Sequence, residues 1–219
     1  MEAYLNQLNE AQRLPTVHKE GPLMVIAGAG SGKTRVLTYR IAYLMQQGVD
    51  SFSILALTFT NKAAKEMKGR IASIVGDSEA KNLWMGTFHS VFAKILRFEA
   101  DRLGYPSNFT IYDTQDSDRL IASIIKEMKL DKDVYKYKQI RSRISSFKNS
   151  LITVRAYMNN PELIEADRDA RRPQMGEIYN EYVDRCFKAG AMDFDDLLLK
   201  TNELLNRFPE VLAKYQDRF

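Results

Sequence analysis

The stretch Leu23-Met-Val-Ile-Ala-Gly-Ala-Gly-Ser-Gly-Lys-Thr34 decides the fold of this chain. Its first four residues are apolar and predict a short buried strand, and its glycines predict a tight turn. After the turn, apolar residues recur at helical spacing, at Val36, Leu37, Tyr39, Ile41 and Leu44. A strand, a glycine-rich loop and a helix in this order can hold a phosphate chain. Glycines let backbone N–H groups approach the phosphates, and the helix N-terminus adds unpaired N–H groups and partial positive charge.

Two side chains at the end of this stretch carry the predicted chemistry. Lys33 would reach the outer phosphates, and the hydroxyl of Thr34 would bind the Mg²⁺ that accompanies them. The strict P-loop pattern has glycine where this chain has Ala27. The run Gly-x-Gly-Lys-Thr between a predicted strand and a predicted helix outweighs that difference and favours a nucleoside triphosphate site. The alternative is a flexible glycine turn with a lysine there by chance.

Length and composition describe an ordinary globular protein. The 219 residues allow one or two domains, and 45% are apolar and 27% charged. We see neither an apolar run near the roughly 20 residues that span a bilayer nor the basic start and apolar core of a signal peptide. A single cysteine, Cys186, excludes an internal disulfide framework and fits a reducing cytosol. We expect an inert, half-buried thiol, a cytoplasmic location and no membrane partner.

The charge distribution leans toward nucleic acid. The formal net charge is +4 and the pI is about 9.0. Residues 134–161 contain basic side chains and no Asp or Glu; the basic residues are Lys136, Lys138, Arg141, Arg143, Lys148 and Arg155. On charge alone a solvated helix face is the simpler interpretation, and a contact with duplex DNA is the alternative.

Strands and helices alternate in the first half of the chain. The runs at residues 54–58 and 83–87 predict short strands of a parallel sheet, and helices are predicted at residues 35–45 and 89–103 and in the segment that follows Phe59 and reaches about Val75. Residues 1–20 are predicted to be mostly helical, with Pro15 ending or kinking the helix. This order is typical of βαβ units with right-handed crossovers.

The alternation of predicted strands and helices stops after residues 109–112. Asp113 or Thr114 is a good N-cap, and the following segments carry apolar stripes at helical spacing with no convincing strand before residue 190. We predict an α/β fold with a parallel P-loop NTPase sheet of the RecA type and an all-helical inserted subdomain. The domains expected are residues 1–112 for the first part of the parent domain, 113–190 for the insertion and 191–219 for the return.

With these pieces placed, the chain resembles the N-terminal part of superfamily 1A DNA helicases of the UvrD/PcrA/Rep family. Leu8-Asn-Glu-Ala-Gln12 is similar to the family's Q motif, and Ala27-Gly-Ala-Gly-Ser-Gly-Lys-Thr34 matches its form of the P-loop, including the alanine. The resemblance implies that Gln12 hydrogen-bonds adenine and favours ATP over GTP. It implies ATP and Mg²⁺ as cofactors, with Lys33 as the catalytic residue and Thr34 as the metal ligand. The implied nucleotide-binding residues are Gln12, Ala27, Gly28, Ala29, Gly30, Ser31, Gly32, Lys33, Thr34 and Arg35.

Further motifs of the family imply a DNA track. Leu57-Thr-Phe-Thr-Asn-Lys-Ala-Ala64 is similar to motif Ia, and Gly86-Thr-Phe-His-Ser90 matches motif Ib. Each directly follows a predicted strand, where open α/β sheets place ligands. The residues implied to hold single-stranded DNA are Phe59, Thr60, Asn61, Thr87, Phe88 and His89. A core position is the alternative for Phe59, and a structural role beside a helix N-cap is the alternative for His89. Contact with a base is the alternative for Phe194, but the three aspartates around it would repel phosphate, so we expect core packing there.

The resemblance also implies that, in relatives, the Asp–Glu pair of the Walker B motif and a second RecA-like domain lie C-terminal to the segment matched by this chain. We therefore expect the N-terminal fragment of an ATP-dependent 3′→5′ helicase and single-strand translocase. It would bind single-stranded DNA and ss/ds junctions, with repair-protein partners unknown, and would be inactive in hydrolysis by itself. The alternatives are the N-terminal part of an AddA/RecB-like helicase–nuclease subunit and a non-catalytic nucleotide-dependent DNA-binding module. A nucleotide kinase explains motifs Ia and Ib poorly.

Overall fold

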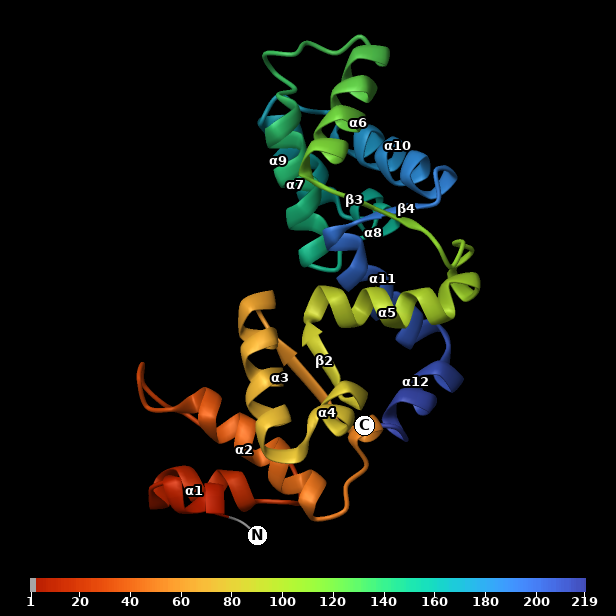
Figure 1. Ribbon diagram of the computed structural model, residues 1–219. Coiled ribbons are helices and arrows are strands. Elements are labelled where there is room, and N and C mark those ends of the chain that lie inside the picture. Colours follow the sequence, from red (N-terminus) through yellow and green to blue (C-terminus); the bar gives the residue numbers. More distant parts are fainter. Residues whose placement is uncertain (1–2) are drawn as a thin grey trace. The chain divides into compact units, whose positions relative to one another are not determined.

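The computed structural model describes residues 3–219 and divides the chain into two compact units (Figure 1). The first unit contains the described residues up to Val91 together with Ala213–Phe219, and the second is Phe92–Leu212. Helix α5 (Phe88–Glu99) begins in the first unit and continues into the second. Among residues 3–219, no helix is both long enough and apolar enough to cross a membrane.

The first unit is an α/β unit built around two strands. Its strands are β1 (Leu55–Thr58) and β2 (Trp84–Thr87). The helical elements are η1 (Ala3–Gln7), α1 (Glu10–Val17), α2 (Lys33–Gln46), η2 (Ser51–Ser53), α3 (Asn61–Val75) and α4 (Asp77–Asn82). The strands predicted at residues 54–58 and 83–87 and the helix ending at Val75 are confirmed. Pro15 lies inside α1, which continues to Val17.

The two strands of this unit are parallel, with Leu55 opposite Trp84 and Thr58 opposite Thr87. This register places the ends of both strands, and the residues that come after them, at one edge of the sheet. Helix α3 packs against both strands (Figure 1). The core beneath it is apolar and includes Ile41, Ile54, Ala56, Met67, Ile71, Ala80 and Leu83.

The strand predicted before the glycine loop is not formed. Residues 23–26 have no regular secondary structure and are drawn as a loop in Figure 1. Their side chains are exposed, with Met24 at 83% and Ile26 at 88%. A strand needs a neighbour to satisfy its backbone N–H and C=O groups. Among residues 3–219, β1 pairs only with β2 and no strand pairs with residues 23–26, so their apolar character alone does not produce a buried strand.

The second unit is almost entirely helical. After α5 it contains η3 (Ala100–Leu103) and the strand β3 (Thr110–Tyr112). The helices are then α6 (Thr114–Glu127), α7 (Tyr137–Asn149), α8 (Val154–Met158), α9 (Pro161–Asp169) and α10 (Met175–Lys188). The chain continues through β4 (Ala191–Asp193), α11 (Phe194–Arg207) and α12 (Pro209–Gln216).

Local signals placed several of these elements correctly. Asp113 caps α6 by accepting from the backbone N–H groups of Gln115 and Asp116. The predicted helix after motif Ib ends at Gly104, whose φ of 78° is readily adopted only by glycine. No strand forms between residues 113 and 190, and β4 pairs in parallel with β3. The positions of the domain boundaries, at residues 112 and 190, stay a prediction.

A buried ionic network joins α7 to the start of α11. The ammonium of Lys148, whose side chain is fully buried, lies 2.7 Å from Asp193 Oδ2 and 2.8 Å from Asp196 Oδ1. The hydroxyl of Tyr182 donates to Asp193 Oδ2 at 2.8 Å and lies 3.0 Å from Ser117 Oγ. Burial favours the neutral amine, but the two carboxylates outweigh it and raise the pKa of Lys148. The network therefore contains a charged lysine.

This network and two further ion pairs change the interpretation of the basic segment. Arg141 donates to Asp118 Oδ1 at 2.7 Å, and Arg143 donates to Asp167 Oδ1 at 3.1 Å. Together with Lys148, these side chains are bound to carboxylates of other elements. The interpretation of the run from Lys136 to Arg155 as one solvated face is therefore wrong for the buried Lys148, and contact of this segment with duplex DNA stays a prediction.

Candidate functional site

The glycine loop before α2 turns through two glycines in the left-handed backbone region. Gly30 and Gly32 have positive φ angles of 76° and 86°, a conformation that side-chain-bearing residues rarely adopt. A Cβ on Gly32 would also lie 2.7 Å from the side-chain nitrogen of Gln12. Ser31 closes the turn because its N–H and hydroxyl both donate to the Gly28 carbonyl, at 3.3 and 2.8 Å. Gly32 is therefore favoured by its own conformation, whereas the Gln12 amide, at the end of a flexible side chain, could shift to make room for a Cβ.

Lys33 and Thr34 are the first two residues of α2, where backbone N–H groups lack intrahelical partners. The Lys33 ammonium curls back over the loop and donates to the carbonyls of Ala27, at 3.0 Å, and Gly28, at 2.7 Å. It is exposed. An anion entering the loop would therefore meet a lysine held by two neutral carbonyls, which a phosphate can replace as partners with a stronger charge-assisted hydrogen bond.

Gln12 connects the Q motif to this loop. Its side-chain nitrogen donates to the Ser31 carbonyl at 2.8 Å. Its side-chain oxygen accepts from the Asn9 N–H at 3.3 Å, which forms a capping box at the start of α1. The contact with Ser31 spans 19 positions in sequence. Its role as an adenine reader stays a prediction, because the amide has protein partners at both ends.

A hollow of about 380 Å³ lies over the start of α2. Six of the predicted nucleotide-binding residues line it: Gln12, Gly30, Gly32, Lys33, Thr34 and Arg35. The other four, Ala27, Gly28, Ala29 and Ser31, belong to the same loop but do not line the hollow.

Two residues of α3, Glu66 and Arg70, also line the hollow, and the sequence analysis did not predict them there. Arg70 forms an i,i+4 ion pair with Glu66 there. The spacing of four residues on a predicted helix signalled the pair itself. It did not signal the face of α3 that carries it, since that depends on how α2 and α3 pack.

The donor set fits a nucleoside triphosphate with Mg²⁺. Positive charge comes from Lys33, Arg35 and Arg70, and neutral donors come from the backbone of a glycine loop at a helix N-terminus. The Thr34 hydroxyl is an oxygen ligand of the kind Mg²⁺ prefers. Within residues 3–219 no cluster of three or more acidic, His or Cys residues could by itself hold a metal.

The predicted DNA-binding residues gather at the edge of the sheet where β1 and β2 end. Phe59 directly follows β1 and is 90% exposed, so it is not a core residue. Its ring lies 5.7 Å from that of Phe88, centre to centre, with the planes tilted by 39°. Two aromatic rings from different motifs thus form one patch, and Phe59 offers an open face for a planar group.

Polar residues flank this aromatic pair. Thr60 caps α3 by accepting from the Ala63 N–H at 3.1 Å, and Asn61 is the first residue of that helix and is exposed. Thr87 ends β2, where its hydroxyl accepts from the Ser90 N–H at 3.2 Å. His89 lies one residue after Phe88 and is partly buried with contacts of its own. The six predicted residues therefore lie at one sheet edge, as expected from their positions after parallel strands.

Phe194, in the second unit, differs from the prediction. Core packing was expected, but 49% of the side chain is exposed. The aspartates around it explain the difference. Asp193 and Asp196 are drawn inward to Lys148 and cap α11, which leaves the intervening residues on the outer side of the first turn.

Comparison with known proteins shows that the chain matches one protein family over most of its length. Residues 8–219 match the family described as UvrD/REP helicase N-terminal domain. The chain is 42% identical over 220 residues to the ATP-dependent DNA helicase PcrA of Staphylococcus aureus (strain Mu50), and 42% identical over 221 residues to that of Staphylococcus epidermidis (strain ATCC 35984). Both alignments cover 100% of this chain and 29% of the relative, so the chain spans less than a third of the proteins it resembles.

Proposed function

Because this chain belongs to the UvrD/REP helicase family through its N-terminal domain, we propose that it binds ATP with Mg²⁺ in the hollow over α2 and single-stranded DNA at the sheet edge. The observation that carries the first half is the convergence of Gln12, Lys33 and Thr34 on one hollow beside a glycine loop. The second half is supported by the exposed Phe59 and its contact with Phe88.

Each residue has a distinct role in the proposed nucleotide site. The loop N–H groups and the start of α2 hold the phosphate chain, and Lys33 exchanges the Ala27 and Gly28 carbonyls for the outer phosphates. Mg²⁺, when bound, offsets phosphate charge, and the Thr34 hydroxyl is its protein ligand. Gln12 turns from Ser31 to adenine, or holds the loop while the base binds beside it.

The proposed DNA contact does not read sequence. A base stacks on the open face of Phe59, and Thr60, Asn61 and Thr87 lie beside it to contact the backbone. Stacking on an aromatic ring tolerates all four bases, which suits a protein that moves along a strand.

We further propose that the whole protein is an ATP-dependent 3′→5′ helicase and translocase, in which ATP draws two RecA-like domains together and hydrolysis releases them. Phosphoryl transfer is catalysed mainly by positioning and charge stabilisation. In residues 3–219 the one carboxylate lining the hollow is Glu66, which is paired with Arg70. The chain alone is therefore expected to bind ATP without turning it over, and DNA-stimulated ATPase activity of the purified chain would contradict this.

The test of the nucleotide site is titration with a fluorescent ATP analogue and Mg²⁺. Lys33→Ala removes the charged donor and should weaken binding about tenfold or more, since hydrogen bonds to charged groups contribute about 1.5–3 kcal/mol. Lys81→Ala, at an exposed position on α4, removes the same charge away from the hollow and should leave affinity unchanged. Equal affinities for the wild type and Lys33→Ala would refute the site.

A further inference from the structure

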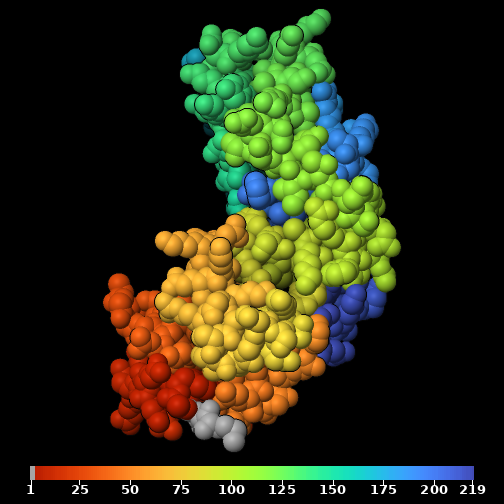
Figure 2. Space-filling model, in the orientation of Figure 1, coloured from red at the N-terminus to blue at the C-terminus, as the bar shows by residue number. Residues whose placement is uncertain are grey.

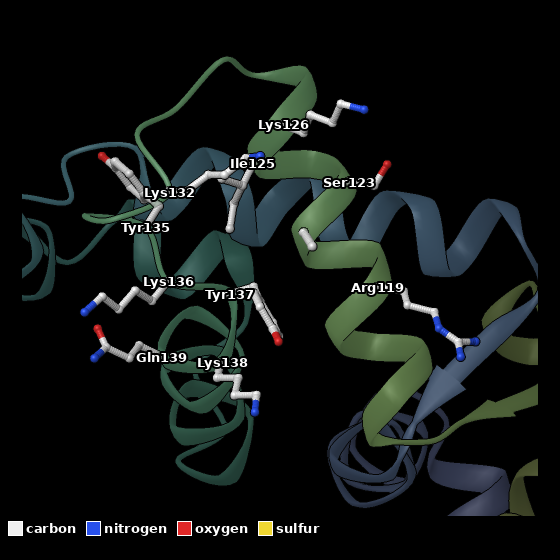
Figure 3. A pocket seen from close by; sticks show the side chains of 11 residues that line it. Arg119, Ser123, Ile125, Lys126, Lys132, Tyr135, Lys136, Tyr137, Lys138 and Gln139 are labelled. Carbon is white, nitrogen blue, oxygen red and sulfur yellow. The ribbon is translucent and has the colours of Figure 1, made fainter.

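A second and larger hollow lies entirely within the helical unit, between α6 and the segment that leads into α7. Its volume is about 950 Å³, which is at the upper end of ligand pockets. Its lining comes from Arg119, Ala122, Ser123, Ile125, Lys126, Lys132, Tyr135, Lys136, Tyr137, Lys138 and Gln139. Figure 3 shows these side chains on α6 and on the segment that leads into α7; in this view Arg119, Ser123 and Lys126 extend from the side of α6 away from Tyr137. Nothing in the proposed binding of ATP and single-stranded DNA uses it.

The floor of this hollow is apolar. Ile125 and Tyr135 are nearly buried, at 2% and 5% exposure, and Ala122 adds a small side chain from α6. Tyr137 is 40% exposed, and its ring lies in the space between α6 and the opposite wall (Figure 3). An apolar floor with a half-exposed aromatic ring is suited to receive an apolar or aromatic side chain.

The rim is positively charged and contains no carboxylate. Five cations line the hollow, namely Arg119, Lys126, Lys132, Lys136 and Lys138, and neither Asp nor Glu is among the lining residues. Of the carboxylates nearby in sequence, Glu127 binds Arg185 at 2.7 Å, while Asp131 and Asp133, which flank Lys132, are exposed. Five lining cations against these two carboxylates leave the rim with a net positive charge.

These cations differ from three others in the same unit. Arg141, Arg143 and Lys148 are each bound to a carboxylate. None of the four rim lysines forms an ion pair in the described part of the chain, and Arg119 makes only a 3.9 Å contact with Asp116. Figure 2 shows the surface of α6 and the following loop, in green, uncovered on the face in view. The rim is thus available to a negatively charged partner.

We propose that this hollow docks an acidic peptide segment of a partner protein, with an apolar or aromatic side chain on the floor and carboxylates on the rim. Charge complementarity requires an anionic partner, and the apolar floor requires one that also carries an apolar group. A duplex presents phosphates but no apolar group that could fill such a hollow. Both requirements are met by a peptide.

The test uses a fluorescein-labelled peptide, Glu-Asp-Asp-Phe-Asp-Asp, whose binding to the full chain is followed by anisotropy. Two matched peptides test the apolar group and the negative charge separately. One has Ser in place of Phe, and the other has Asn in place of every Asp. Both should bind at least about tenfold more weakly than the parent, since the first loses the burial of the aromatic ring and the second loses charge. Binding of the parent peptide should weaken as salt is added.

Protein variants locate the site. Lys132→Glu with Lys136→Glu should weaken binding about tenfold or more by reversing rim charge. Arg155→Glu with Arg168→Glu changes the net charge equally at exposed positions outside the hollow and should have less than a twofold effect. Ala122→Trp fills the hollow without changing charge and should also abolish binding.

Three outcomes would overturn the proposal: no peptide binding, equal loss in both charge-reversed variants, or full binding by Ala122→Trp. Duplex and single-stranded oligonucleotides are tested in parallel. If they bind and respond to the rim variants while the peptide does not bind, the hollow is a nucleic-acid site and the proposal is wrong. None of these results depends on ATP binding at Lys33, so the two proposals fail separately.

Discussion

Replacing Lys148 by methionine should destabilise the helical unit strongly. The ammonium is fully buried between Asp193 and Asp196, at 2.7 and 2.8 Å, and its aliphatic stem is similar in size to methionine. The substitution keeps most of the packing and removes the charge. Two buried carboxylates would then face each other without a cation. Breaking a buried ion pair in this way costs about 3–5 kcal/mol.

The pH dependence of this loss gives a second signature. In the wild type, burial and the neighbouring Asp193 carboxylate raise the pKa of Asp196. The pKa of Asp193 is lowered because the Lys148 ammonium outweighs the effect of burial. In Lys148→Met both folded-state pKa values should rise above the unfolded value of about 3.9. Groups with raised folded pKa values contribute stability below the unfolded pKa and lose it as pH rises. The variant should therefore be more strongly destabilised at pH 8 than at pH 5.

Urea unfolding followed by far-UV circular dichroism measures the loss, since the second unit is mostly helical. Fluorescence of Trp84, the chain's one tryptophan, reports on the first unit, and the urea midpoint that it gives should differ little between the wild type and Lys148→Met. Lys188→Met is the matched control, because Lys188 is exposed and paired with Asp184. It should cost no more than about 0.5 kcal/mol. A loss below about 1 kcal/mol for Lys148→Met, or one equal to that of Lys188→Met, would refute the reasoning.

Three further predictions concern other parts of the chain. Phe59→Ala should weaken binding of oligo-dT by about 1–3 kcal/mol, the usual contribution of one stacked base. The urea midpoint should not change. Unchanged affinity for oligo-dT would show that Phe59 does not contact the DNA. The Cys186 thiol is 2% exposed and burial raises its pKa to about 12, so Ellman's reagent should react at pH 8 only in urea, and rapid reaction of the native protein would contradict its burial. Gln12→Ala should reduce the preference for ATP over GTP; an equal loss for both nucleotides would mean that Gln12 acts only through its bond to Ser31.

The features that the sequence predicted correctly depend on local chemistry. Asp113 caps its helix through hydrogen bonds to the next few residues, and Gly104 ends its helical segment through its own φ angle. The motifs after β1 and β2 meet because parallel strands end at the same edge. The position of Phe59 and Phe88 in one patch could therefore be expected from their places in the chain.

The features that could not be predicted from the sequence depend on contacts with residues far away in the chain. Residues 23–26 are as apolar as a buried strand, but strand formation requires a neighbour that no local pattern supplies. The sequence does not show which cations of the basic segment are ion-paired, because the carboxylates bound by Arg143 and Lys148 lie 24 and 45 positions away in sequence. The rim lysines that remain unpaired could be separated from them only once these ion pairs were located.

The central claim is that the glycine loop and the start of α2 form the nucleotide site. Hydrogen exchange of the backbone amides, measured with and without ATP and Mg²⁺, tests it most directly, because the proposed contacts are made by those amides. At an ATP concentration near the wild-type dissociation constant, protection should appear at residues 28–35 in the wild type and be much weaker in Lys33→Ala, while exchange in α10 stays unchanged. Protection confined to other residues, or equal protection in Lys33→Ala, would contradict the claim.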